Sequence, residues 1–289
     1  YTPYTASTDA YNYAPSNYLQ VPQERFLMSA QTHYEVSKAF NVYAEGQLIN
    51  NRVKNQLAPT PFTGSVQIDV DSSFLSPSSQ TLLRGLDTDG DGYVTSTIYR
   101  RLTEVGARVS SNDNTAYRAV LGANGDIGGG WNYDAYYSYS RTRSVETQTG
   151  NVSRSRVLQA LKTTYDSSGN LVCSDSSNGC VPLNIFGVGN ISAAAADFIS
   201  IPTQNSSTIS EQVASASISN RNLFDLGAGP VGIVFGTEYR REHGAYSPDF
   251  ALSSGDVVGF NGGEGLSGGY DVKEAYTEVA VPLLADIPL

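Results

Sequence analysis

The sequence has few charged residues and, among them, few cations. Only 16% of its 289 residues are charged, and 18 Lys and Arg stand against 28 Asp and Glu, which gives a net charge of −10. An ordinary soluble domain has about 25% charged residues. Proteins that bind phosphate backbones carry clustered basic residues, so this acidic chain with scattered cations argues against a nucleic-acid partner.

Long hydrophobic runs are also missing. The longest apolar stretches, such as residues 279–285, fall far short of the roughly 20 residues that a membrane-spanning helix needs. The chain opens on Tyr1-Thr-Pro-Tyr-Thr5, which has neither the basic nor the apolar region of a signal peptide. We therefore expect no helical membrane anchor, and either an intracellular chain or one whose beginning has been removed.

Histidine is almost absent, which limits the enzymes that the chain could form. Gly265-Leu-Ser-Gly-Gly269 matches the nucleophile-elbow pattern of serine hydrolases, but such enzymes place their His after the Ser. Both histidines, His33 and His243, precede Ser267. No cluster of His, Cys and carboxylates has metal-enzyme spacing, and no phosphate-cradling glycine loop precedes a helix. We predict that the protein is not an enzyme.

Cysteine occurs twice, at Cys173 and Cys180, with turn-forming residues between. This spacing favours a small disulfide loop formed in an oxidising compartment. A zinc site is the alternative, but no nearby His or third Cys completes its ligand set.

The residues that are present alternate between apolar and polar with a period of two, which is typical of β-strands. From Phe26 to Val36 the even positions are mostly apolar, and the pattern restarts at Phe40 as the second arm of a hairpin. The fold class is therefore all-β. The same alternation predicts seven strands, near residues 24–36, 40–50, 98–127, 131–143, 209–221, 230–243 and 270–283.

Strand length and loop parity favour a membrane barrel. Ordinary strands have about 5–6 residues, whereas strands that cross a bilayer need about 9–11. The short connections, 37–39, 128–130 and 222–229, fall at one end of the predicted sheet, and the long loops, 51–97, 144–208 and 244–269, fall at the other. Outer-membrane barrels have short periplasmic turns and long extracellular loops.

We therefore expect part of an antiparallel transmembrane β-barrel with long extracellular loops. A hairpin tip at Asn112-Asp-Asn114 would divide the strand 98–127, but it would move the loop 144–208 to the side of the short turns. A soluble β-sandwich, which also alternates, is the alternative. The 19 Tyr favour the barrel, since Tyr suits a membrane–water interface.

Five segments spread over nearly the whole chain point to one family. They are residues 11–25, Leu57-Ala-Pro-Thr-Pro61, Cys180-Val-Pro-Leu-Asn-Ile-Phe-Gly187, Gly236-Thr-Glu-Tyr-Arg240 and residues 270–284, which open with Tyr270-Asp-Val-Lys-Glu-Ala-Tyr276. These segments resemble the barrel region of TonB-dependent outer-membrane receptors, most of all the large receptors of sphingomonads and caulobacters. They follow one another in the order that the family would give them.

The resemblance implies a receptor in the outer membrane of a Gram-negative bacterium. Such receptors have a plug domain followed by a barrel of about 22 strands. Here we predict seven strands, nothing resembles the plug, and Pro288-Leu289 is not a terminal aromatic strand. We therefore expect an internal piece of a longer polypeptide, because an open sheet edge is not tolerated in lipid.

The function implied by the resemblance is energised uptake of a scarce nutrient. The cargo would be a siderophore–metal complex, a vitamin, a saccharide or a peptide. The partners would be outer-membrane lipid and the energy-transducing TonB complex, which would act through the missing plug region. No cofactor is required. Charged residues on the polar faces of the strands would line the lumen of a barrel, whereas for any single one of them a solvated or mutually paired charge is the favoured alternative. These candidates are His33, Glu35, Arg108, Arg118, Glu238, Arg240, Glu274 and Glu278.

One loop carries a possible calcium site. Asp87, Asp89 and Asp91 recur at every second position before Gly92, as in the first half of an EF-hand loop, and the Tyr93 carbonyl would be a further ligand. The twelfth position is Ile98 instead of the expected bidentate Glu, so a solvated acidic turn is the alternative. The rival function is a secreted or surface structural or adhesive β-sandwich with a calcium-binding loop.

Overall fold

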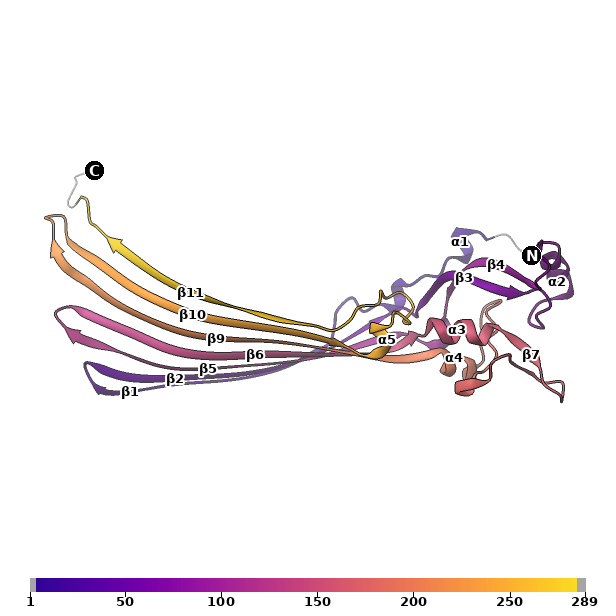
Figure 1. Ribbon diagram of the computed structural model, residues 1–289, viewed down its shortest axis with the longest axis horizontal. Helices are drawn as coiled ribbons and strands as arrows, with labels where there is room; N and C mark the ends of the chain where they lie inside the picture. The colour runs from indigo at the N-terminus through magenta and orange to yellow at the C-terminus, as the bar shows by residue number, and fades with distance from the viewer. Residues whose placement is uncertain (1–3, 285–289) are drawn as a thin grey trace.

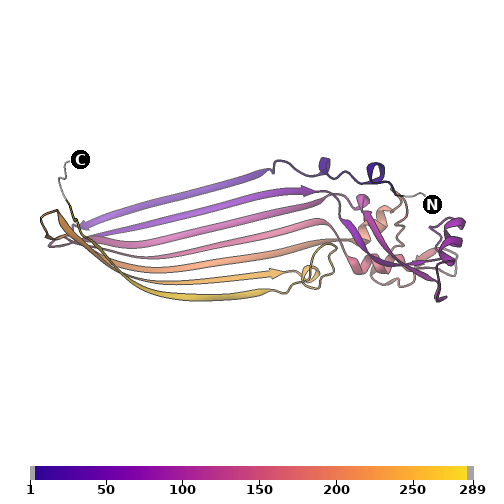
Figure 2. The same ribbon diagram turned by 90° about the horizontal axis from the view of Figure 1, so that it is seen from above.

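The computed structural model describes residues 4–284, of which most form antiparallel β-structure. Strands account for 58% and helices for 14% of the chain. One seven-stranded sheet dominates, and each strand pairs with its neighbours in chain order (Figures 1 and 2). Its strands are β1 (Gln23–Ser37), β2 (Phe40–Leu57), β5 (Arg108–Gly128), β6 (Trp131–Val152), β9 (Ser200–Asp225), β10 (Pro230–Pro248) and β11 (Leu266–Ala280).

The predicted all-β class and the long antiparallel strands are confirmed, but several strands extend further than predicted and one predicted strand is wrong. The predicted strand 98–127 is divided: β4 (Tyr93–Arg101) ends before a 3₁₀ turn, η2 (Thr103–Val105), and β5 begins at Arg108. Leu102 is buried in the break, and Gly106 has a φ of 91° that turns the chain. The pairing of β5 with β2 and β6 runs without a break through 112–114, so that segment is no hairpin tip.

The two ends of the large sheet differ. At one end, which we call the turn end, tight turns join β1 to β2, β5 to β6 and β9 to β10 (left in Figure 1). Gly129 and Gly130 have φ values of 62° and 80°, which the turn after β5 requires. At the other end, the loop end, the connections are long and carry helices and hairpins. They span residues 58–107, 153–199 and 249–265. The second and third are shorter than predicted, because the strands extend further, whereas the first is shifted along the chain, because β2 ends at Leu57 and β5 begins at Arg108.

These long connections fold into a small unit of their own, the loop-end unit. It contains the hairpin of β3 (Pro61–Asp69) with β4, the hairpin of β7 (Thr163–Tyr165) with β8 (Leu171–Cys173), and a 3₁₀ turn, η3 (Ser177–Gly179). Its helices are α2 (Pro77–Arg84), α3 (Arg154–Leu161), α4 (Ala193–Ile199) and α5 (Phe250–Ser253), while α1 (Ala6–Asp9) and η1 (Ala14–Ser16) precede β1. Ser76, Ser153 and Ser192 begin helices by accepting a backbone N–H at the third helical residue.

The main hydrophobic core lies in the loop-end unit and not against the large sheet. Its largest buried side chains include Leu102 on the β4–β5 connection, Leu183, and Ile199 at the end of α4. Val152, the last residue of β6, is the member that the large sheet contributes. None of the 15 residues of β1 is buried. No helix within residues 4–284 is long and apolar enough to cross a membrane.

Two glycines let aromatic rings lie flat on the large sheet. Gly122 faces Tyr43 across the β2–β5 pair, and a Cβ on Gly122 would lie 2.2 Å from the Tyr43 ring. Gly236 faces Tyr276 in the same way, at 2.1 Å. Glycines at such positions allow a sheet to curve, and the aromatic ring covers the bare backbone. Both figures show the sheet as a long, curved ribbon.

Candidate functional site

The candidate site is the large sheet itself, whose two faces have opposite character. Side chains alternate between faces along a strand, and residues that pair directly across antiparallel strands share a face. The pairing therefore traces each face across all seven strands. One such row runs Thr32, Ala44, Leu121, Tyr137, Ala214, Tyr239 and Lys273.

One face carries a continuous uncharged stretch that we call the apolar band. Its members, by the pairing of the strands, are Phe26, Met28, Ala30, Thr32, Tyr34, Val36, Val42, Ala44, Gly46, Leu48, Tyr117, Ala119, Leu121, Ala123, Tyr133, Ala135, Tyr137, Tyr139, Ala214, Ala216, Ile218, Ile233, Phe235, Thr237, Tyr239, Ala275, Thr277 and Val279.

None of the large side chains of the apolar band is buried, and most of them are exposed. Phe26, Leu121 and Val279 are 58%, 61% and 54% exposed. A soluble sandwich would cover such a face with a second sheet, but the other two sheets in residues 4–284 are short hairpins of the loop-end unit. The band is therefore a large one-sided apolar surface, of a kind that marks contact with lipid or with another protein.

The loop-end border of the apolar band follows one row across β1, β2 and β5, through Glu24, Arg52 and Asp113, and crosses the remaining strands diagonally. The first charged residue on this face is Glu24 in β1 but Lys273 in β11. The row through Lys273 meets β1 at Thr32, eight residues beyond Glu24. Eight residues measure about 26 Å along a strand, and six strand spacings measure about 29 Å across the sheet. Averaged from β1 to β11, the strands are therefore inclined by about 43° to the direction perpendicular to this border.

The height of the apolar band follows from the same geometry. In β1 the band extends from Phe26 to Val36, which is about 33 Å along the strand. At an inclination of about 43° this length projects to about 24 Å. Tyr117, Tyr139 and Tyr239 lie beside the loop-end border, and Tyr34 and Tyr133 lie toward the turn end.

Over the length of the apolar band, the charged residues lie on the opposite face. All eight lumen candidates lie on it: His33, Glu35, Arg108, Arg118, Glu238, Arg240, Glu274 and Glu278. They form no single cluster. Arg118 lies 3.6 Å from Glu45, and Arg240 lies 3.6 Å from Glu242.

The face opposite the apolar band is acidic over β9, β10 and β11. Arg108 donates to the Ala58 carbonyl at 2.9 Å near the loop end. Glu238 lies directly opposite Glu274, and Glu211 lies directly opposite Glu242, so like charges face each other across β9, β10 and β11. This side of the sheet is therefore acidic, and it is unsuited to contact with hydrocarbon.

The predicted calcium ligands lie in the loop between α2 and β4. Ligand oxygens of Asp87, Asp89 and Asp91 all lie within 4.8 Å of one another. Asp87 accepts the backbone N–H groups of Gly90 and Gly92 at 2.8 and 3.0 Å. Slight desolvation raises the pKa of Asp87, but the hydrogen bonds from Gly92 and Gly90 outweigh it, so this pKa lies below its ordinary value. Tyr93 begins β4, and Ile98 lies within that strand.

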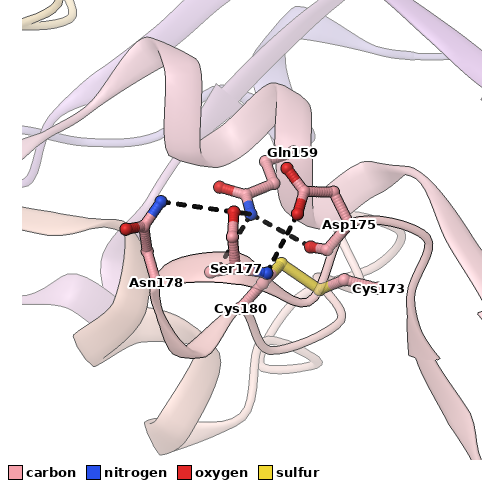
Figure 3. The surroundings of a disulfide bond; sticks show 6 residues. All are labelled: Gln159, Cys173, Asp175, Ser177, Asn178 and Cys180. Carbon is pink, nitrogen blue, oxygen red and sulfur yellow. Dashed lines mark hydrogen bonds between the residues drawn. A yellow bond between two sulfur atoms is a disulfide. The ribbon is translucent and has the colours of Figure 1, made fainter.

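The predicted disulfide between Cys173 and Cys180 is confirmed. It joins β8 to the residue after η3, and the side chain of Gln159 in α3 holds the loop between them (Figure 3). Gln159 Nε2 donates to the carbonyl oxygens of Asp175 and Ser177, each at 3.0 Å. The disulfide loop is thereby attached to the loop-end core.

A cleft of about 840 Å³ opens in the loop-end unit, between the N-terminal segment, β4 and residues 185–187. Tyr11, Tyr99 and Phe186 contribute aromatic rings, and Arg100 also lines it. Nη2 of Arg100 lies 2.5 Å from Oε1 of Glu104, and both side chains are nearly buried. Burial lowers the pKa of Arg100, whereas the charge of Glu104 opposes this shift.

Sequence reasoning missed the residues at the border of the apolar band and those of the cleft. Arg141, Arg143, Arg241 and Lys273 lie just beyond the band on the same face. The signal that could have found them is a cation at an otherwise apolar parity in each strand.

Comparisons of the chain with protein-family models, with curated proteins and with solved structures found no match.

Proposed function

We propose that this chain forms part of the wall of a transmembrane β-barrel in the outer membrane of a Gram-negative bacterium, in a receptor for energised uptake of a scarce nutrient. The observation that carries the proposal is the uncharged, exposed apolar band on one face of the large sheet. Acyl chains would cover this band, and its acidic opposite face would line the aqueous interior.

The dimensions of the band support this placement. Outer-membrane barrels have an apolar band about 25 Å tall and strands tilted by about 35–45°. The apolar band of this chain is about 24 Å tall, and its strands are inclined by about 43°. The inclination depends on the charged residues of the border, whereas the height also depends on the length of the apolar run in β1. The two dimensions therefore rest in part on different residues, and both match those of outer-membrane barrels.

Aromatic residues support the same placement. Barrels carry aromatic girdles at both membrane–water interfaces. Tyr117, Tyr139 and Tyr239 mark the loop-end border, and Tyr34 and Tyr133 lie toward the turn end. The short turns would then face the periplasm, and the loop-end unit would lie outside the cell. Its disulfide suits this oxidising side of the membrane.

The sheet edges support a chain that is one part of a larger barrel. β1 and β11 each have one partner within residues 4–284. The seven strands alternate in direction, so β1 and β11 run the same way and would pair only in parallel. An all-antiparallel closure needs an odd number of further strands between them, because an open edge in lipid leaves backbone groups without partners. The same longer polypeptide would supply these strands and a plug.

Transport is proposed from the resemblance to TonB-dependent receptors. The plug would occupy the interior against the charged face, and the TonB complex would act on it. The aromatic cleft around Tyr11, Tyr99 and Arg100 is the place in the loop-end unit that best suits first contact with a cargo. The cargo class remains a siderophore–metal complex, vitamin, saccharide or peptide, and the barrel wall carries out no covalent chemistry.

A calcium ion is proposed as a structural ligand of the loop-end unit. Asp87, Asp89 and Asp91 converge on one point, and calcium favours several carboxylate and carbonyl oxygens. The ion would hold the turn that leads into β4 and would take no part in transport. The rival function, an adhesive surface protein, would use the same loop but would need the apolar band to be covered by protein.

The membrane placement is tested with tryptophan fluorescence. Trp131 is the one Trp of the chain, so Trp131→Phe gives a background without signal. Tyr137→Trp places the probe on the apolar band, and Tyr136→Trp places it one residue away on the opposite face. In vesicles of brominated phosphatidylcholine we expect strong quenching of the first and little of the second. Equal, weak quenching of both, with full solubility in plain buffer, would favour the adhesive protein.

Transport is tested separately from membrane placement. Cells with and without the gene are supplied with labelled ferric siderophores, cobalamin and oligosaccharides, with and without a protonophore. We expect the gene to be required for uptake of one of these classes and the protonophore to abolish it. Uptake that is unaffected by the protonophore would refute the energised mechanism, even if the barrel wall is correct.

A further inference from the structure

Four cations lie on the face of the apolar band, immediately beyond its loop-end border. Arg141 and Arg143 follow Tyr139 on β6, Arg241 follows Tyr239 on β10, and Lys273 precedes Ala275 on β11. We call these four residues the cationic border. All four are exposed, and within residues 4–284 no ion pair joins any of them to a carboxylate.

The cationic border contrasts with the rest of the chain. The chain has a net charge of −10, and the opposite face of β9–β11 carries Glu211, Glu238, Glu242 and Glu274 around Arg240. On the border itself two acids lie near these cations: Asp271 is directly opposite Arg241, and Asp113, which pairs with Arg52, is two residues from the partner of Arg143. Positive charge is therefore concentrated on one side of the sheet, where the apolar band ends.

The spacing of the three arginines suits one headgroup, and Lys273 lies further along the border. Arg141 and Arg143 are two residues apart on the same face, which is about 7 Å. Arg241 lies two strands and one two-residue step from Arg141, about 12 Å between backbones. The long side chains can bring these groups together on a ligand with two phosphates. Guanidinium groups bind phosphate oxygens through paired hydrogen bonds.

An amphipathic surface adjoins the cations. Tyr117 pairs directly with Arg141, and its ring lies 5.9 Å from that of Tyr139. Tyr rings are favoured where hydrocarbon meets headgroups. A ligand held by the cationic border would therefore have its polar part among the cations and its apolar part against the band.

We propose that the cationic border binds the phosphate groups of an anionic lipid headgroup in the leaflet on the loop-end side. The proposal rests on the proposed membrane placement and adds a defined lipid partner to it. Free phosphate shares the chemistry but lacks the acyl chains that the adjoining band would contact, so the proposal commits to lipid.

The experiment uses the full-length protein in a neutral detergent and diphosphorylated lipid A as the probe, with bound lipid counted by native mass spectrometry. The test variant is R141Q/R143Q, and a second variant is R241Q/K273Q. The matched control is K38Q/R221Q, which removes two exposed cations at the turn end. Brominated-lipid quenching of Trp131 reports membrane insertion for every variant.

Each cation near an anionic surface contributes about fivefold to affinity, so each test variant should bind lipid A about 25-fold more weakly than the control. Insertion into phosphatidylcholine vesicles should be unchanged. Equal lipid A binding by test and control variants, with normal insertion, would overturn the lipid site and leave the barrel proposal intact. Failure of every variant and of the wild type to insert would overturn the membrane placement itself.

Inorganic phosphate provides the remaining arm. It should displace lipid A only weakly, because the apolar band contributes to lipid binding. Two results together would show that the site takes free phosphate and that the lipid assignment is wrong. Inorganic phosphate would displace lipid A as effectively as a soluble phosphorylated analogue of the headgroup, and dephosphorylated lipid A would show no residual binding.

Discussion

A single arginine in the middle of the apolar band distinguishes a lipid-facing surface from a water-facing one. Leu121 lies near the middle of the β5 part of the band, between Tyr117 and Ala123, and is 61% exposed. Arg at the bilayer midplane of a barrel costs about 2–4 kcal/mol. Leu121→Arg should therefore lower the free energy of unfolding in a membrane by about 2–4 kcal/mol, or about 30- to 900-fold in the folding equilibrium.

The assay is a urea titration of the full-length protein in phosphatidylcholine vesicles, followed by Trp131 fluorescence and by heat-modifiable mobility. Leu121→Ala removes apolar area without adding charge, so it separates the two contributions. Gln31→Arg adds the same charge on the opposite face, across from Glu45, and should change stability by less than about 0.5 kcal/mol. Tyr117→Arg, beside the border, should cost only about 0–1 kcal/mol.

The reasoning fails if Leu121→Arg changes the free energy of unfolding by less than about 0.5 kcal/mol, which is the usual effect of a substitution on a water-facing surface. It also fails if Leu121→Arg and Gln31→Arg destabilise equally, because the two faces would then have the same surroundings. A cost that does not decline from Leu121 to Tyr117 would contradict the inclined border.

Three other predictions concern the loop-end unit. The double substitution Cys173→Ser and Cys180→Ser should lower the free energy of unfolding of this unit by about 2.5 kcal/mol, because a small closed loop is lost. Protease resistance at rising temperature measures this loss, and membrane insertion should be unchanged. An unaltered digestion profile would contradict a stabilising disulfide. For Glu104, desolvation raises the pKa, but the hydrogen bond from its own backbone N–H and the charge of Arg100 lower the pKa by more. The folded pKa of Glu104 therefore lies below the ordinary value of 4.5. Its stabilising contribution is therefore complete above about pH 4.5 and is lost as the pH falls through the folded value. The melting temperature of wild type should therefore fall more between neutral pH and acid than that of Glu104→Gln, and parallel pH profiles would exclude this role. Terbium, a calcium mimic, should luminesce on excitation of Tyr93. Asp89→Asn should weaken terbium binding at least tenfold, whereas the control Asp166→Asn, in another exposed turn, should leave it unchanged. Luminescence that does not decrease when a chelator is added would count against the site.

The cleft and the cationic border are proposed binding sites for different ligands, and they lie in different parts of the protein. The cleft near Arg100 belongs to the loop-end unit, with its own buried core. The cationic border belongs to the large sheet, on the face that would meet lipid. Variants at the two places should therefore separate cargo capture from lipid binding. Because the two effects are separable, the transport proposal can be tested before the cargo is identified.

Much of the fold could be predicted from local patterns. The alternation from Phe26 to Val36 identified β1 and its two faces, because side-chain direction in a strand depends only on parity. The eight charged candidates were placed on one face for the same reason. Gly128-Gly-Gly130 identified a tight turn, since glycine accepts positive φ values, and the cysteine spacing indicated the disulfide.

The division of 98–127 was beyond reach of the same reasoning. Val105 and Ala107 keep the parity of β5, yet Val105 packs on the loop-end core and Ala107 precedes the strand. A break that preserves parity leaves no trace in an alternating pattern. The pairing of β4 with β3 joins residues far apart in sequence, so only the tertiary structure shows it.

The amino-acid sequence by itself determined which residues face the same way along each strand, because that depends on backbone geometry between near neighbours. Only the tertiary structure decided how the strands are offset from one another. The offset aligns Lys273 with Thr32 and not with Glu24, and it turns seven separate apolar runs into one inclined band with a cationic border. Offsets between strands arise from hydrogen bonds and packing across the sheet, which no single strand encodes.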